Sequence, residues 1–154
     1  MPHIHKLYDF VVSIFIVHKN KTLLVYHKKY NEWVPIGGHV DLNEDPEEAL
    51  HKEIWEESHL KVRLFSQAPK ISHPGVKSLP APDFMDVHRI TDTHKHIALI
   101  YFGTSTSSKA VLHQREHREL RWLDKRELKD PKLNLSKSIF FYSLKALEKS
   151  KQHS

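Results

Sequence analysis

The first forty residues alternate between apolar segments and polar breaks, a pattern that predicts β-strands. Residues 8–17 (YDFVVSIFIV) and 22–26 (TLLVY) are rich in β-branched and aromatic side chains, and polar residues 18–21 separate them. Such side chains favour strands, so we expect a hairpin with a four-residue turn. Residues 33–40 (WVPIGGHV) contain a proline and two adjacent glycines, which predicts a short extended segment interrupted by unusual backbone angles.

A helix is predicted shortly after this segment. Asp45 suits the N-cap, Pro46 suits the first helical position, and Glu48 lies three residues after the cap. This combination is typical of a helix start. We therefore expect a helix from Pro46 to about Ser58.

The remaining chain predicts four strands, one long irregular segment and a closing helix. The strands are expected at residues 61–65, 87–90, 96–104 and 119–123, and the irregular segment at residues 68–84, which are rich in proline. The run at 96–104 (HIALIYFGT) is nearly continuously apolar, which indicates burial on both faces. Apolar residues at helical spacing predict an amphipathic helix over residues 135–149, capped by Asn134 or Ser136. Strands on both sides of a central helix predict a mixed α/β sheet covered on two faces.

Composition limits the class of protein. The chain has 154 residues, 39% of them hydrophobic and 10% aromatic; this is enough for a core, so we expect one domain over residues 1–154. It has no cysteine, which excludes disulfides, thiolate metal sites and a cysteine nucleophile and favours a cytoplasmic location. The longest apolar run, residues 10–17, is too short to cross a bilayer, and the beginning MPHIHK lacks a signal-peptide pattern. We expect no membrane partner.

Charge is distributed unevenly along the chain. The net charge is +5, but residues 41–57 hold eight carboxylates and one lysine, a local charge of −7, so the other residues together carry +12. A basic surface attracts phosphates or nucleic acid, whereas a concentrated carboxylate cluster repels them unless a cation lies between.

Three carboxylates share one face of the predicted helix. At roughly 100° per residue, Glu53, Glu56 and Glu57 lie within an arc of about 100°. Like charges at this spacing destabilise a helix by roughly 0.2–0.5 kcal/mol per pair, a penalty that a divalent cation removes. Carboxylates suit Mg²⁺ or Mn²⁺, which proteins bind through a few such ligands together with substrate phosphates and water. Periodicity alone leaves a second interpretation open, a solvated acidic helix face.

The wider pattern over residues 38–60, GHVDLNEDPEEALHKEIWEESHL, resembles the Nudix box of the Nudix hydrolase family. In that box, Gly is followed after five residues by Glu and after seven more by Arg-Glu, an aliphatic residue, any residue, Glu-Glu, any residue, Gly and an aliphatic residue. Seven of nine defined positions match: Gly38, Glu44, Glu53, Ile54, Glu56, Glu57 and Leu60. The preceding WVPIGGHV is similar to the family's aromatic-x-Pro-x-Gly-Gly segment. The resemblance implies a Nudix-type α/β/α sandwich with a mixed β-sheet and a central helix that carries the box.

Two positions of the box depart from the family pattern. Lys52 stands where the family has the Arg that braces the carboxylates, and lysine keeps the charge but lacks the planar fork that holds two oxygens at once. His59 stands where the family has Gly, just past the helix end, where a left-handed backbone costs a non-glycine residue roughly 1 kcal/mol. The first departure concerns catalysis, and the second concerns stability.

The resemblance also implies roles for the matching residues. Glu53, Glu56 and Glu57 would ligate or bridge Mg²⁺, with Mn²⁺ as a substitute. The Gly38 carbonyl would be a further ligand. Glu44 would support the box by pairing with the basic residue at position 52.

A further carboxylate is implied outside the box. In several family members, a Glu six residues before a Trp on a later strand completes the metal site or acts as base. Glu116 lies six residues before Trp122. Its other interpretation is a surface residue in the charged run QREHREL, and Glu119 is the alternative candidate.

The implied reaction is hydrolysis of a nucleoside diphosphate linked to another group, as in a nucleotide or nucleotide-sugar substrate. Water would attack one phosphorus of the pyrophosphate, with Mg²⁺ neutralising the oxygens and Glu53 or Glu116 accepting the proton. Two alternatives stay open: a Nudix-like nucleotide-binding module that has lost turnover, and a pyrophosphohydrolase acting on RNA ends. The implied partner is a small nucleotide, or an RNA end under the second alternative. The sequence leaves open whether the chain forms a homo-oligomer.

Several other residues have both a structural and a functional interpretation. His113 and His117 have the spacing of a zinc pair, although no third ligand is evident in the sequence. Trp33 is expected to pack at the sheet edge, Phe84 is a candidate for stacking on a base, and His96 either packs or faces the substrate. Three basic residues are candidate phosphate contacts: Lys70, Lys77 and Arg89.

Overall fold

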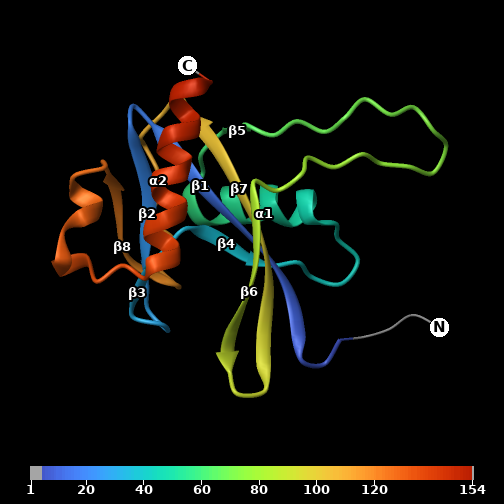
Figure 1. Cartoon of the computed structure of the whole chain (residues 1–154). Helices are drawn as coiled ribbons and strands as arrows, with labels where there is room; N and C mark the ends of the chain where they lie inside the picture. The colour runs from blue at the N-terminus through green and yellow to red at the C-terminus, as the bar shows by residue number, and fades with distance from the viewer. Residues whose placement is uncertain (1–4, 154) are drawn as a thin grey trace.

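The computed structural model describes residues 5–153, so the first four residues of MPHIHK lie outside it. Over this range the chain forms eight strands, two α-helices and two short 3₁₀ helices (Figure 1). The strands are β1 (Tyr8–His18), β2 (Lys21–His27), β3 (Glu32–Val34), β4 (Ile36–His39), β5 (Val62–Leu64), β6 (Phe84–Thr91), β7 (His94–Ser105) and β8 (His117–Leu123). The helices are α1 (Pro46–Ser58), η1 (Glu127–Lys129), η2 (Pro131–Leu133) and α2 (Lys137–Gln152).

The strands join in one mixed sheet. Its central order is β3-β2-β1-β7-β5, while β4 pairs with β1, β6 with β7 and β8 with β2. β1 and β7 run parallel from the pair Tyr8/Lys95 to the pair Val17/Thr104, whereas the other pairs are antiparallel. A parallel pair needs a long crossover, and the intervening chain with α1 supplies it. The predicted mixed sheet is confirmed.

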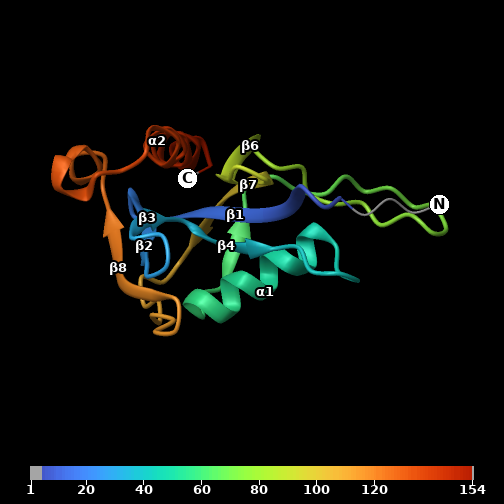
Figure 2. The same cartoon turned by 90° about the horizontal axis from the view of Figure 1, so that it is seen from below.

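The two α-helices cover opposite faces of this sheet (Figure 2). Successive side chains of a strand point to opposite faces, and β1 shows this directly. Val11 and Phe15 pack in the cluster under α2, while Val12 and Ile14 pack in the cluster with α1. Burial on both faces explains why β1 and β7 have nearly continuous apolar sequences. The expected α/β/α sandwich is thus confirmed.

The first hairpin differs from the prediction of a four-residue turn. His18 and Lys21 pair with each other as the last residues of β1 and β2, so the loop has only two residues. These are Lys19 and Asn20, with φ of 44° and 62°. Two consecutive left-handed residues make the kind of tight turn that matches the twist of the flanking strands. The prediction was wrong because polarity alone does not reveal which polar residues still pair.

The helix starts follow from local side-chain chemistry. Asp45 accepts hydrogen bonds from the N–H groups of Glu47 and Glu48, and the Glu48 side chain accepts one from the Asp45 N–H, which completes a capping box. α2 begins later than expected because Ser136 is its N-cap, whereas Asn134 ends η2 in a left-handed conformation. Over residues 5–153, neither helix is long and apolar enough to cross a membrane.

The other boundaries are close to those predicted. Residues 66–83 form no helix or strand, as their proline content indicated. β6 begins at Phe84 rather than at residue 87, and β8 begins at His117 rather than at Glu119. η1 and η2 were not predicted, because each is a single short turn without a periodic apolar pattern.

The helix that carries the acidic pattern ends at a strained residue. His59 adopts φ 54° and ψ 20°, and its N–H donates to the Trp55 carbonyl at 3.0 Å. A left-handed conformation costs a non-glycine residue roughly 1–2 kcal/mol, whereas glycine adopts it freely.

We predict that His59→Gly raises the unfolding free energy by about 0.5–1 kcal/mol. The relief of strain exceeds the extra chain entropy that glycine brings to the unfolded state. Urea denaturation measures the change. His51→Gly, on the exposed face inside the same helix, is the matched control and should destabilise. A lower stability of His59→Gly would contradict this account of the helix end.

Candidate metal and catalytic site

Each of the two glycines of β4 allows a close approach, Gly38 to α1 and Gly37 to β1. A Cβ atom at Gly38 would lie 2.4 Å from Oε1 of Glu53, and one at Gly37 would lie 2.3 Å from the Val12 carbonyl oxygen. Both distances are far below van der Waals contact. The Glu53 carboxylate therefore rests directly on the backbone of β4, in space that any side chain at position 38 would fill.

Two carboxyl groups of α1 lie together at this contact, that of Glu57 buried and that of Glu53 partly buried. Glu57 is only 3% exposed; it accepts a hydrogen bond from the Gly37 N–H, and its carboxyl group is hydrogen-bonded to that of Glu53. Burial, followed by repulsion from nearby carboxylates, raises the pKa of Glu53 to about 7 and that of Glu57 to about 9. Because the pKa of Glu57 is raised well above 7, its carboxyl group holds a proton at neutral pH when no cation is bound.

One oxygen of this pair lacks a partner. Oε2 of Glu57 is buried and has no hydrogen bond among residues 5–153. Nε2 of His117 lies 3.7 Å from it, but burial lowers the pKa of His117 to about 4, so the ring is neutral at pH 7 and supplies no countercharge. A buried, unpaired carboxylate oxygen is costly. The donor set fits a hard divalent cation, which would replace the proton on Glu57 and complete the oxygen's coordination.

Glu56 and Glu116 lie on the open side of this pair. Both are exposed, and the negative charge of each raises the Glu53 pKa. Glu116 also raises the Glu57 pKa, whereas Glu119 lies 2.5 Å from Nε of Arg121. Glu116 is therefore within electrostatic range of both Glu53 and Glu57.

The zinc pair suggested by spacing is not formed. The rings of His113 and His117 are 6.3 Å apart, and Nδ1 of His113 lies 3.1 Å from the Glu56 carbonyl oxygen. Instead, ligand atoms of His27, Glu116 and His117 lie within 4.8 Å of one another. Sequence reasoning missed His27 because it reaches His117 only through the pairing of β2 with β8.

Lys52 is held in place by two carboxylates. Its Nζ donates to Oε1 of Glu44 at 2.8 Å, as expected, and to Oδ2 of Asp41 at 2.7 Å, which was not expected. Within residues 5–153 it makes no hydrogen bond to the three box carboxylates. Its charge still lowers the Glu53 pKa, so Lys52 acts on the buried pair through space.

A cavity of about 760 Å³ reaches Glu116 and Gly38, the glycine against which Glu53 lies. Gly37, Gly38 and Glu116 line one side, and Ile139 and Tyr142 of α2 line the other. The basic lining of the cavity includes four residues: Lys28, Lys29, Arg89 and Arg115.

The other candidate residues have mostly structural roles. Trp33 is buried and packs edge-on against Tyr26, as expected. Phe84 packs against Phe102 and the aromatic residues of α2, so it is not free to stack on a base. Lys77 pairs with Asp45 at the start of α1. Of the three basic candidates, only Arg89 lines the cavity.

Comparisons with known proteins agree with this architecture. The family model for the NUDIX domain matches residues 7–144. A solved NUDIX-family hydrolase from Clostridium perfringens is 33% identical, with a TM-score of 0.79 over 91% of this chain and 96% of that one. A MutT NUDIX hydrolase from Burkholderia pseudomallei (22% identical, TM-score 0.65, 93% and 98% covered) and a MutT protein from Methanosarcina mazei Go1 (17%, 0.67, 97% and 99%) share the fold. No curated protein matches the sequence.

We predict that the metal-free protein loses about 2 kcal/mol of stability between pH 7 and pH 9. The pKa of Glu57 is raised on folding, so the folded state holds more protons than the unfolded state in this window, and stability falls as pH rises. The buried histidines do not contribute, because their pKa values are lowered to about 4.

Denaturation in EDTA at several pH values tests this dependence. Glu57→Gln should flatten it, since glutamine is neutral throughout, while Glu119→Gln should leave it unchanged. Equal slopes in Glu57→Gln and the unmodified protein would show that the buried carboxyl is not protonated.

Proposed function

Because the chain belongs to the Nudix hydrolase family, we propose that it is a Mg²⁺-dependent pyrophosphohydrolase. As a single domain over residues 1–154, it would cleave a nucleoside diphosphate linked to another group, with Mn²⁺ as a substitute ion. The observation that carries this proposal is the Glu53–Glu57 pair with its buried, unpartnered oxygen, together with a cavity that Gly37, Gly38 and Glu116 line. The cysteine-free composition supports a cytoplasmic location.

The proposed division of labour follows from burial. The less exposed Glu53 and Glu57 would hold the cation together with the Gly38 carbonyl, and the exposed Glu56 and Glu116 would be its further ligands. When bound, Mg²⁺ would neutralise the phosphate oxygens and favour ionised water. Glu116 would accept the proton of the attacking water, because it is the box-associated carboxylate that lines the cavity.

The cavity supports a small substrate. Its volume of about 760 Å³ is in the usual range for sites that enclose small ligands. Nonpolar side chains such as Ile139 contribute to its lining, and Arg89 adds a positive charge. This combination suits a nucleotide with a pyrophosphate at one end better than an extended RNA. The complete carboxylate set argues for turnover rather than binding alone.

The test is hydrolysis of a panel of pyrophosphate nucleotides and nucleotide sugars with excess Mg²⁺, with released phosphate or nucleotide as the readout. Glu53→Gln and Glu57→Gln should each lower kcat at least about 100-fold, because each removes a charged ligand of the cation. Glu119→Gln is the matched exposed control and should retain activity. Full activity in Glu57→Gln would refute the site, and substrate retention without product in the unmodified protein would favour a binding module.

We also predict that Lys52→Arg raises Mg²⁺ affinity or turnover about two- to tenfold. A guanidinium group can hold Asp41 and Glu44 with paired hydrogen bonds and thereby fix the loop before α1 more firmly than an ammonium group. Initial rates over a Mg²⁺ titration measure the effect. Lys77→Arg, which also pairs with carboxylates near the helix start, is the control and should change little. Identical rates in Lys52→Arg and the unmodified protein would contradict a bracing role for the residue at position 52.

A further inference from the structure

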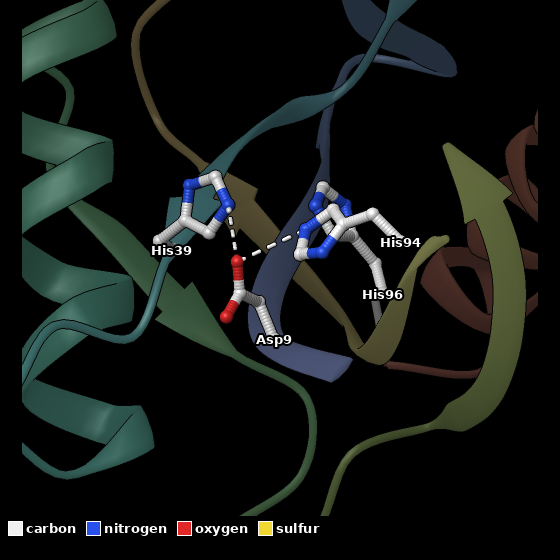
Figure 3. A group of neighbouring side chains, drawn as sticks. All are labelled: Asp9, His39, His94 and His96. Carbon is white, nitrogen blue, oxygen red and sulfur yellow. Dashed lines mark ion pairs between the residues drawn. The ribbon is translucent and has the colours of Figure 1, made fainter. Parts of the chain in front are cut away.

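Three histidines and one aspartate converge at a second place in the sheet (Figure 3). The histidine cluster consists of Asp9 on β1, His39 on β4, and His94 and His96 on β7. One ligand atom from each residue lies within 4.8 Å of the other three. Oδ2 of Asp9 lies 3.0 Å from Nε2 of His94 and 3.6 Å from Nε2 of His39.

The strand register puts these side chains on one face. Asp9 is the direct partner of His96 in the parallel β1–β7 pair, and His94 precedes His96 by two residues, so it points the same way. His39 is the partner of Val11, which lies two residues after Asp9. Three hydrogen-bonded strands therefore hold all four side chains, which preorganises the cluster more than a loop would.

One ring of the cluster is buried without a polar partner. His96 is only 8% exposed, and among residues 5–153 its ring nitrogens make no hydrogen bond; its neighbours are the rings of His39, His88 and His94. Burial and these neighbouring imidazoles lower the pKa of His96 to about 4, so at neutral pH it has the uncharged form that binds metals. His88 is not a further member, because its Nδ1 lies 2.8 Å from Oδ1 of Asp86.

We propose that the histidine cluster is a binding site for Zn²⁺ or a similar first-row transition ion, separate from the carboxylate site. Three imidazoles and one carboxylate are a common ligand set for tetrahedral Zn²⁺, whereas Mg²⁺ prefers oxygen ligands. At Zn–ligand distances near 2.0–2.1 Å, tetrahedral ligand atoms lie about 3.4 Å apart. Rotations of His39 and His94, whose side chains are 50% and 29% exposed, would bring the ligand atoms to this spacing from their present separations of at most 4.8 Å.

The location defines what such an ion does. A bound ion joins His39 of β4, directly after Gly38, to the beginning of β7, next to the β6–β7 turn. His39 and His96 also line the cavity that reaches Glu116. The ion thus fixes the edge of that cavity and stabilises the folded state, without replacing the oxygen-bound cation. This site is independent of the proposed hydrolysis, since it rests on different side chains.

The experiment uses Co²⁺ as a spectroscopic probe on the full chain, after EDTA treatment and in excess Mg²⁺, which occupies oxygen-rich sites. Tetrahedral Co²⁺ absorbs visible light strongly, and octahedral Co²⁺ absorbs weakly. The unmodified protein should give the tetrahedral spectrum at one ion per chain, and Zn²⁺ should displace it. Zn²⁺ alone should also raise the Tm by at least about 5 °C, because it binds the folded state.

Two partly exposed members provide variants that should fold. His94→Ala and Asp9→Asn should each weaken Co²⁺ binding at least about 100-fold, because even outer-shell partners change metal affinity 10–100-fold. They should also abolish the Zn²⁺-dependent rise in Tm. His73→Ala, an exposed loop histidine outside the cluster, is the matched control and should leave both unchanged.

Three outcomes overturn the proposal. One is the absence of a tetrahedral Co²⁺ spectrum in the unmodified protein. Another is an unchanged spectrum in His94→Ala and Asp9→Asn. The third is loss of the spectrum in His27→Ala while His94→Ala keeps it, which would place the ion at the group formed by His27, Glu116 and His117. None of these readouts measures hydrolysis, so they do not depend on whether the proposed function holds.

Discussion

The close contact between α1 and β4 is the constraint on which the site depends. Because Gly38 has no side chain, the partly buried Glu53 carboxylate lies against the strand backbone, and the carboxyl group of Glu57 is buried next to it. Burial of two acids is unfavourable unless a proton or a cation is shared between them. The same contact therefore creates both the instability of the metal-free pair and its suitability for a divalent ion.

The rest of the fold positions groups around this contact. The long β1–β7 pair forms the centre of the sheet, α2 closes the far wall of the cavity, and the pairing of β2 with β8 brings Glu116 beside the buried acids. Lys52 ties the preceding loop to α1 through Asp41 and Glu44. The apparent conflict between a basic protein and a local charge of −7 is resolved if the cation stands between the acids and the phosphate.

Local chemistry in the sequence predicted the parts of the structure that depend on neighbouring residues. The capping box fixed the start of α1, and the match to the family's box predicted that three carboxylates of this helix share one site. The features that were predicted wrongly or missed depend on distant strands or on backbone conformation. The turn at Lys19 and Asn20 depends on left-handed φ angles, which polarity does not reveal. The histidine cluster depends on the register between three strands, which a single sequence does not specify.

The most direct test of the central claim is the number of protons released when Mg²⁺ binds. Calorimetric titrations at pH 7 in buffers of different ionisation enthalpy measure this number without any substrate. If the cation replaces the proton shared by Glu53 and Glu57, about one proton should leave per ion bound. Binding with no proton release would contradict the account, because it would mean that the two carboxyl groups are already ionised in the metal-free protein.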